Sequence, residues 1–183
     1  YRRQRQMCIR DSGIIYSKDH GKTWNISTLA RTNTTESQVA EVEPGVLMLN
    51  MRDNRGGSRA VSTTTDLGKT WKEHESSRTA LQEPVCMASL ISVKAKENVL
   101  GKDILLFSNP NDAKNRHSIT IKASLDGGVT WLPENQLLLD AGWGWGYSCL
   151  TMIDKETVGI LYESSVAHMT FQAIKLKDII KTK

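Results

Sequence analysis

The sequence predicts an all-β protein assembled from repeated β-hairpin units. Three observations predict this fold class. Apolar and β-branched stretches alternate with turn signals, one eight-residue pattern occurs three times, and helical periodicity is confined to residues 178–181. Hairpin units that recur every 45–60 residues or so, about the interval seen here, are typical of the four-stranded blades of a β-propeller. About three such blades fit in this length of chain.

The repeated pattern reads Ser/Thr-x-Asp-x-Gly-x-Thr-Trp, and its aspartates are Asp19, Asp66 and Asp126. An aspartate accepts backbone hydrogen bonds within a tight turn, and a glycine two positions later supplies a positive φ. The threonine then begins an extended strand, and we expect the tryptophan ring to pack on the adjacent face. Each of these three repeat turns is therefore predicted to be a structural hairpin, and its aspartate is not expected to take part in catalysis.

Ten stretches are predicted as strands because they are rich in β-branched or apolar residues and are bounded by turn signals such as Pro44-Gly45. A complete propeller usually has at least about four blades, so we expect this chain to form an incomplete one. The predicted strands cover residues 13–16, 38–42, 46–52, 59–64, 87–93, 104–108, 118–123, 147–153, 158–163 and 169–176.

The first twelve residues differ from the rest of the chain. They show neither alternation nor turn signals, and they have no counterpart in the later repeats. We interpret residues 1–12 as an unmatched segment and a possible cloning, sequencing or assembly artefact. The partial propeller domain is therefore predicted to cover residues 13–183.

Charge and composition argue against two classes of protein. The formal net charge is +4, and the first twelve residues contribute +3 of it, from four arginines and one aspartate. The remainder is too nearly neutral to form the electrostatic footprint of a nucleic-acid-binding protein. No apolar stretch is long enough to span a bilayer. We therefore expect neither nucleic acid as a partner nor a membrane span.

The three cysteines give no sign of a metal site or a disulfide framework. Cys8, Cys86 and Cys149 are odd in number and widely spaced, and they form no metal-ligand pattern with the four histidines. Cys86 and Cys149 lie within apolar stretches that read as strands, so both are expected to be buried free thiols. No metal or organic cofactor is expected.

Four further segments resemble motifs of the bacterial sialidase family, in which the three repeat turns correspond to the structural Asp boxes. The resemblance runs over nearly the whole chain. It implies a six-bladed propeller of which this chain is the C-terminal part. The segments are Thr-Glu-Ser-Gln-Val at 35–39, Leu-Asn-Met-Arg at 49–52, Phe-Ser-Asn-Pro at 107–110 followed by Arg116, and Gly-Tyr-Ser-Cys-Leu at 146–150.

The resemblance implies a role for one residue in each segment. Tyr147 would be the catalytic nucleophile and Glu36 its general base, while Arg52 and Arg116 would bind the carboxylate of the substrate. The family's acid/base aspartate and its first carboxylate-binding arginine lie upstream of the matched region. The isolated chain is therefore expected to be unstable and inactive. Glu163 resembles a family segment whose role is mainly structural.

These residue types suit a sugar that carries a carboxylate on its anomeric carbon. A carboxylate nucleophile would be repelled there, whereas a neutral phenol would not. Tyrosine's high pKa makes it inert alone at neutral pH, so a neighbouring glutamate must accept its proton. Sialidases with a tyrosine nucleophile are a recognised exception among glycosidases. The planar guanidinium groups of two arginines would hold the substrate carboxylate.

The predicted function is that of a retaining exo-α-sialidase, which releases terminal sialic acids from glycoproteins, glycolipids or oligosaccharides through a tyrosyl-enzyme intermediate. Three alternatives stay open: a trans-sialidase, another glycosidase on the same scaffold, and a non-catalytic propeller that binds glycans or proteins. We also hypothesise that Trp143 and Trp145 form an apolar rim for the sugar or its aglycone. A secreted or periplasmic location is inferred from the family alone.

Overall fold

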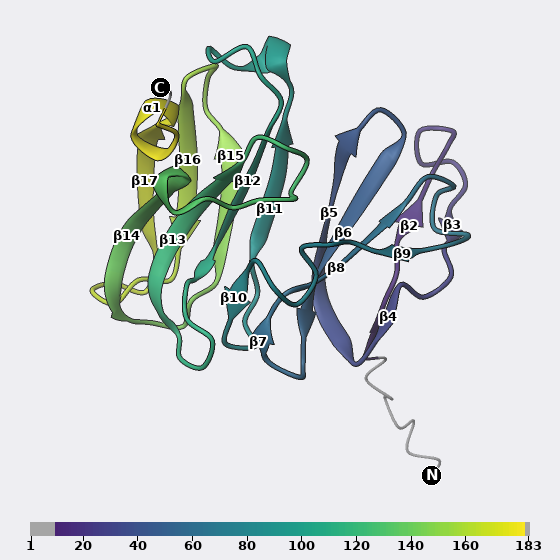
Figure 1. Ribbon diagram of the computed structural model, residues 1–183, viewed down its shortest axis with the longest axis horizontal. Helices are drawn as coiled ribbons and strands as arrows, with labels where there is room; N and C mark the ends of the chain where they lie inside the picture. Colours follow the sequence, from purple (N-terminus) through teal and green to yellow (C-terminus); the bar gives the residue numbers. More distant parts are fainter. Residues whose placement is uncertain (1–9, 182–183) are drawn as a thin grey trace.

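The computed structural model describes residues 10–181, which form antiparallel sheets arranged side by side along the molecule (Figure 1). A first four-stranded sheet has the order β5 (Thr34–Glu43), β6 (Val46–Asp53), β8 (Ala60–Thr64) and β9 (Lys72–Glu73). A second has the order β11 (Ser89–Val93), β12 (Ile104–Pro110), β13 (His117–Ser124) and β14 (Gln136–Trp143). A third sheet has three strands, β15 (Ser148–Met152), β16 (Thr157–Tyr162) and β17 (Thr170–Lys175).

Shorter elements complete the fold. Three two-stranded pairs join β1 to β4, β2 to β3, and β7 to β10. The only α-helix in residues 10–181 is a single turn after β17. Their bounds are β1 (Asp11–Ser12), β2 (Ile15–Tyr16), β3 (Asn25–Ile26), β4 (Arg31–Thr32), β7 (Gly57–Ser58), β10 (Gln82–Glu83) and α1 (Leu176–Ile179), with 3₁₀ turns at Ala95–Glu97 and Pro133–Asn135.

The all-β prediction is confirmed, and each of the ten predicted stretches contains a strand. The sheets do not close into a ring within residues 10–181. The prediction omitted β14, whose Asp140 and Gly142 interrupt any simple apolar alternation. Asp11 and Ser12, which the sequence analysis assigned to the unmatched segment, pair with β4. Residues 1–9 lie outside the described residues, so the interpretation of that segment as an artefact stays a prediction.

Apolar cores lie between successive sheets. Phe107, Trp131 and Met48 belong to the core between the first and second four-stranded sheets, and the Phe107 and Trp131 rings meet edge to face at 5.8 Å. Ile121 and Ile160 belong to the core between the second sheet and the third. Each strand has two faces with alternating side chains, so a sheet can pack against a neighbour on either side. Stacking of this kind fixes the strand ends that carry the candidate site.

The three repeat turns share one hydrogen-bond pattern, as predicted. In each, the aspartate accepts the backbone N–H and the hydroxyl of the threonine four residues later. The preceding serine or threonine accepts the glycine N–H, and that glycine has a positive φ. Hydrogen bonds from Thr23 and Thr70 lower the pKa values of Asp19 and Asp66 to about 2. The side-chain hydrogen bonds of these aspartates all lie within the turn.

The tryptophans of the repeat turns do not all pack as expected. Trp131 is buried, and Trp71 is partly covered and donates to the carbonyl of Thr28 at 3.0 Å. The prediction was wrong for Trp24, which is 60% exposed. The Trp71 ring reaches Thr28 in the preceding unit, and the Trp131 ring packs on Phe107, so the burial of each ring depends on its tertiary neighbours.

Cys149 also corrects a prediction. Cys86 is buried, as expected, and burial raises the pKa of its thiol to about 11. Cys149 is exposed, because it points away from the core on β15 while its neighbour Leu150 points inward. Residues 10–181 include no group of histidine, cysteine and acidic side chains arranged to hold a metal ion. No helix among them has the length and apolar character that a membrane span requires.

Candidate functional site

The four predicted site residues come from three sheets and lie together. Glu36 is near the start of β5, and Arg52 is near the end of the antiparallel strand β6. Arg116 immediately precedes β13, and Tyr147 immediately precedes β15. Hydrogen bonds and a ring contact connect all four side chains. We call this group the Tyr147 cluster.

A β-bulge places Glu36. In the β5–β6 ladder Thr35 faces Arg52 and Ser37 faces Met51, so Glu36 is the extra residue without a partner. A bulge bends its strand and redirects a side chain, and bulges are common beside active sites. Here it brings the Glu36 carboxylate beside the Arg52 guanidinium, with which it forms an ion pair.

Tyr147 is held from both ends. Its hydroxyl donates to Glu36 Oε1 at 2.5 Å and accepts from Arg52 Nη1 at 3.2 Å. Its backbone N–H donates to Glu163 Oε2 at 3.0 Å, so Glu163 fixes the main chain. The preceding Gly146 has φ +88°, and a Cβ there would come within 2.6 Å of Pro110. Only glycine fits this close approach.

The protonation states of the pair follow from these contacts. Burial favours a higher pKa for Glu36, but hydrogen bonds from Tyr147 and Arg52 and the charges of Arg52 and Arg116 outweigh it and lower that pKa. The hydrogen bond to Glu36, together with burial, raises the pKa of Tyr147. Glu36 is therefore an anion at neutral pH, and the proton resides on Tyr147.

Arg116 is held by main-chain carbonyls rather than by an ion pair within the described residues. Its guanidinium donates to the carbonyls of Trp145 at 3.0 Å and Val85 at 3.1 Å, and it lies 5.8 Å from the centre of the Tyr147 ring. Within residues 10–181 it forms no salt bridge. Nε of Arg52 is buried and also has no partner among the described residues. The cluster thus presents positive charge that can attract an anion.

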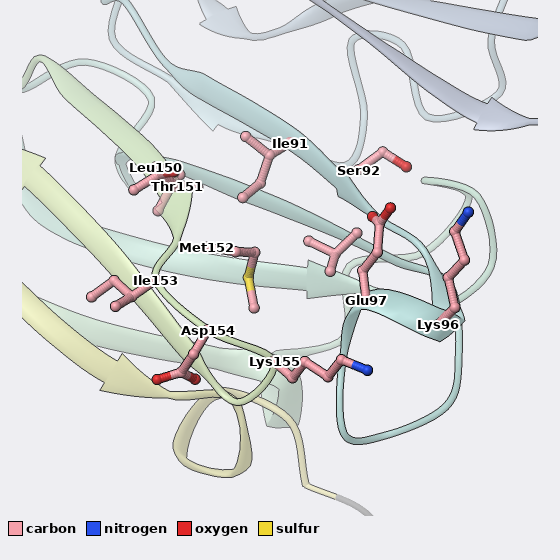
Figure 2. Close-up of a pocket in the computed structure, with 11 residues that line it drawn as sticks. Ile91, Ser92, Lys96, Glu97, Leu150, Thr151, Met152, Ile153, Asp154 and Lys155 are labelled. Carbon is pink, nitrogen blue, oxygen red and sulfur yellow. The ribbon is translucent and has the colours of Figure 1, made fainter.

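Two surface hollows differ in their relation to the cluster. The first includes Trp145, whose carbonyl binds Arg116. Trp143 and Trp145 are 67% and 69% exposed, and with residues 164–168 they line a hollow of about 370 Å³. Another, of about 540 Å³, is lined by the later residues of β11 and β15 and by Lys96, Glu97 and Lys155 (Figure 2). No residue of the Tyr147 cluster lines that second hollow.

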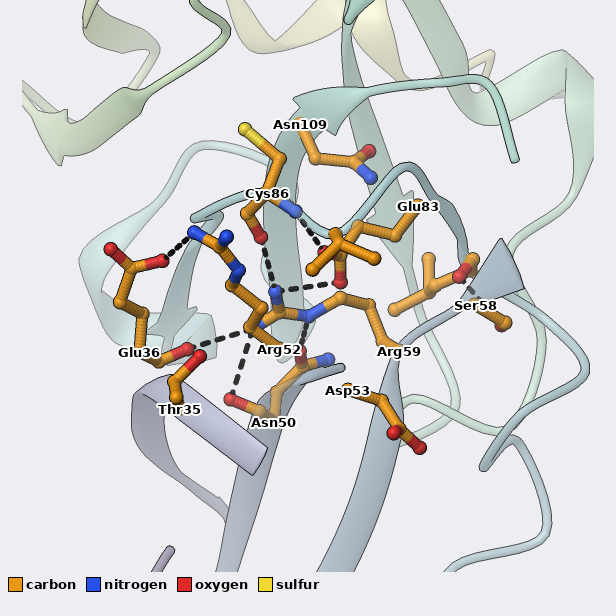
Figure 3. A network of polar contacts seen from close by, with 12 residues as sticks. Thr35, Glu36, Asn50, Arg52, Asp53, Ser58, Arg59, Glu83, Cys86 and Asn109 are labelled. Atoms are coloured by element: carbon orange, nitrogen blue, oxygen red, sulfur yellow. Dashed lines mark hydrogen bonds and ion pairs between the residues drawn. The ribbon is translucent and has the colours of Figure 1, made fainter. Parts of the chain in front are cut away.

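The sequence analysis missed a buried polar network beneath the cluster. Arg59 is fully buried and pairs with Glu83 at 2.8 Å, as Figure 3 shows. Burial raises the pKa of Glu83 and lowers that of Arg59, and their mutual attraction opposes both changes. One sequence signal was available, because Arg59 begins a predicted strand whose other residues are small, and an arginine buried there requires a partner.

The chain is similar to proteins of known kind. Residues 11–160 match the family model described as BNR repeat-like domain. A sialidase from Bacteroides fragilis is 78% identical over 94% of this chain, which corresponds to 32% of that protein. A sialidase from Micromonospora viridifaciens is 34% identical over 81% of the chain and 23% of its own length.

Among solved structures, the Hadza microbial sialidase Hz136 is 74% identical, with a TM-score of 0.90 over 93% of this chain and 33% of that one. The chain thus spans about a third or less of the length of these relatives.

Proposed function

The chain belongs to the BNR repeat-like domain family and is related to the bacterial sialidases, and from this premise we propose that it is part of an exo-α-sialidase. In the complete protein it supplies the later blades of a six-bladed propeller. The substrates are terminal sialic acids of glycoproteins, glycolipids and oligosaccharides. Such substrates lie outside the cytoplasm, so the protein works in the periplasm or is secreted.

One observation carries the proposal: a tyrosine hydroxyl donates to a glutamate between two arginines, one of which has no carboxylate partner in the described residues. In the first step Tyr147 Oη attacks the anomeric carbon and its proton passes to Glu36. The bond to the glycosidic oxygen breaks, and that oxygen takes a proton from an acid supplied by the rest of the protein. A covalent tyrosyl-sugar intermediate results.

In the second step a water molecule attacks the same carbon, and the bond to Tyr147 Oη breaks. The phenolate recovers its proton from Glu36, while the proton of the water returns to the upstream acid, now acting as a base. Two inversions at one carbon give net retention. Transfer to a sugar hydroxyl differs only in the acceptor, so product analysis separates a hydrolase from a transferase.

The arginines do more than bind the substrate. In the free site the charges of Arg52 and Arg116 lower the pKa of Glu36. A substrate carboxylate between the two guanidinium groups neutralises part of that charge. The pKa of Glu36 then rises, and the glutamate becomes a stronger base when Tyr147 must lose its proton. Substrate binding thereby activates the nucleophile.

The test uses a chimera in which this chain replaces the matching segment of the B. fragilis sialidase, with the isolated chain as a second sample. We expect the chimera to release sialic acid from a chromogenic sialoside, and the isolated chain to release none, because it lacks the acid. A folded chimera without activity, beside an active parent sialidase, would falsify the proposal. That result would favour the non-catalytic binding propeller.

The tryptophan rim is a second part of the proposal. Trp143 and Trp145 are exposed, and the Trp145 carbonyl holds Arg116. Apolar sugar faces stack on such rings. Replacement of Trp143 by alanine should raise KM for a sialyl-oligosaccharide more than for a small chromogenic sialoside. Equal changes for the two substrates would remove the rim from the proposal.

A further inference from the structure

Arg59 lies at the centre of the network beneath the Tyr147 cluster, and no part of its side chain reaches solvent. Nε donates to Asn50 Oδ1 at 2.6 Å, and Nη1 donates to Glu83 Oε2 at 2.8 Å (Figure 3). A fully buried arginine needs a carboxylate partner and hydrogen bonds for its remaining protons. The remaining hydrogen bonds of Arg59 go to three main-chain carbonyls, those of Glu36, Asn50 and Cys86.

The first carbonyl belongs to Glu36. Arg59 Nη2 donates to Glu36 O and to Asn50 O, each at 3.3 Å. Glu36 is the bulged residue of β5, without a ladder partner on β6. Arg59 therefore ties the bulge to the strand that carries Arg52, two residues after Asn50. The bulge in turn determines where the Glu36 carboxylate meets Tyr147.

A further carbonyl belongs to Cys86, on the segment that holds Arg116. Arg59 Nη1 donates to Cys86 O at 2.8 Å, and Glu83 accepts the Cys86 N–H. Between Glu83 and Cys86 lies Val85, whose φ is +54°. A β-branched residue in this region is strained and persists only where its surroundings enforce it. The Val85 carbonyl is one of the two that hold the Arg116 guanidinium.

We propose that the Arg59–Glu83 pair is a positioning device that sets both sides of the Tyr147 cluster. On one side Arg59 holds the Glu36 bulge. On the other the pair clamps the strained Val85 turn that presents Arg116. The inference rests on the proposed function for its kinetic consequences, but the position of Glu36 relative to Tyr147 can be tested without activity. Lysine cannot replace Arg59, because a single ammonium lacks the planar fork that reaches all these acceptors.

The test compares Arg59→Lys with Arg78→Lys in the chimera. Arg78 is a matched control, because it also binds a buried carboxylate, Asp53 at 2.9 Å, and the carbonyls of Gly56 and Ser58, without contacting the cluster. Both variants should lower the melting temperature. Only Arg59→Lys should also lower kcat/KM, by about 100-fold, as a displacement near 1 Å can do.

A second measurement does not depend on activity. The hydrogen bond to Glu36 raises the pKa of Tyr147. Absorbance titration of the phenolate, with the matching Tyr147→Phe protein subtracted, reports that pKa. In Arg59→Lys it should fall toward the ordinary value for tyrosine, and in Arg78→Lys it should not move. If the parent chimera is inactive, the proposed function fails, yet this titration still decides the positioning role.

Glu83→Gln separates the two sides of the device. It leaves Arg59 able to bind the Glu36 carbonyl but weakens the clamp on Cys86 and Val85. We expect KM to rise several-fold through Arg116, with the pKa of Tyr147 unchanged. Glu83→Gln also tests the inference if Arg59→Lys does not fold. Unaltered kinetics and an unaltered Tyr147 pKa in the folded variants would show that the pair only stabilises the protein, and would overturn the inference.

Discussion

Two arginine–glutamate pairs adjoin in the structure, linked by the hydrogen bond from Arg59 to the Glu36 carbonyl, and have opposite surroundings. In the Arg52–Glu36 pair the side chains are 18% and 36% exposed, whereas in the Arg59–Glu83 pair they are 0% and 1% exposed. The buried pair is enclosed by main-chain groups that use its hydrogen-bonding capacity. The exposed pair keeps an unpartnered Nε among the described residues and shares Tyr147.

The difference in solvent exposure explains how the same two residue types can have different functions. A pair sealed from solvent and saturated with hydrogen bonds has no reason to change its protonation state, so it serves as a fixed support. A pair that faces solvent can meet a ligand, and a bound anion changes the local charge. This difference supports the proposed roles, proton transfer for Glu36 and positioning for Arg59. The predictions below challenge that division, from the largest expected effect to the smallest.

Removal of the Tyr147 hydroxyl should have the largest effect. In the chimera, Tyr147→Phe leaves Glu36 without a proton to accept and the anomeric carbon without a nucleophile. We expect kcat to fall by about 10⁴-fold or more, measured with a chromogenic sialoside. The control is Tyr162→Phe, which removes a hydroxyl that accepts from Gln172 at 2.9 Å and makes no hydrogen bond to the Tyr147 cluster within the described residues. Comparable activity in the two variants would end the nucleophile assignment.

Neutralising each glutamate in turn tests the division directly. Glu36→Gln should lower kcat by about 10²–10⁴-fold, because the base is lost. Its melting temperature should change little, since the pair is partly solvated. Glu83→Gln should lower the free energy of unfolding by about 3–5 kcal/mol, because Arg59 is then buried without its counter-charge.

We therefore expect Glu36→Gln to lose mainly activity and Glu83→Gln to lose mainly stability. Kinetics and thermal unfolding of the two proteins, prepared together, measure both quantities. If Glu36→Gln proved the more destabilising of the two, the comparison of the pairs would be wrong.

The sequence predicted most of the fold because its signals are local. At the turns of Asp19, Asp66 and Asp126 the aspartate and the preceding hydroxyl find their partners within four residues, so the turn can be recognised from a short stretch of sequence. Trp24 was wrongly predicted to be packed, because the burial of such a ring depends on its tertiary neighbours rather than on the turn itself. The strand β14 was missed because its residues are half-buried on both faces and give no clear alternation.

The candidate site was predictable only in part. Short motifs pointed to Glu36, Arg52, Arg116 and Tyr147, and the structure brings those side chains together, although their catalytic roles stay predictions. No sequence motif pointed to the Arg59–Glu83 pair beneath them. Arg59 and Glu83 are far apart in the sequence and at no regular spacing, and only the pairing of β7 with β10 brings their segments together. A pair of this kind can therefore be recognised only from the tertiary structure.

The pH dependence of the chimera sharpens the account of Glu36. Because Glu36 must be ionised to accept a proton, activity should be lost as pH falls through its pKa. In the free protein that pKa is lowered, so the acid limb of kcat/KM should lie below glutamate's ordinary value. In the substrate complex the bound carboxylate offsets the arginine charges, so the acid limb of kcat should lie higher. Coincident acid limbs would contradict activation by substrate binding.

The smallest effect on activity is expected at the repeat turns. Asp126→Ala removes the acceptor for the N–H and hydroxyl of Thr130, at 2.9 and 2.6 Å, and frees Ser124. The melting temperature should fall by a few degrees, while kcat per folded molecule stays the same, because the turn does not contact the Tyr147 cluster. Asp19→Ala is the matched comparison, and its effect should be smaller, because Trp24 beside it is already exposed. A loss of kcat in folded Asp126→Ala protein would mean that the hairpin turns also influence the site, and that the division between support and chemistry extends further than the two ion pairs.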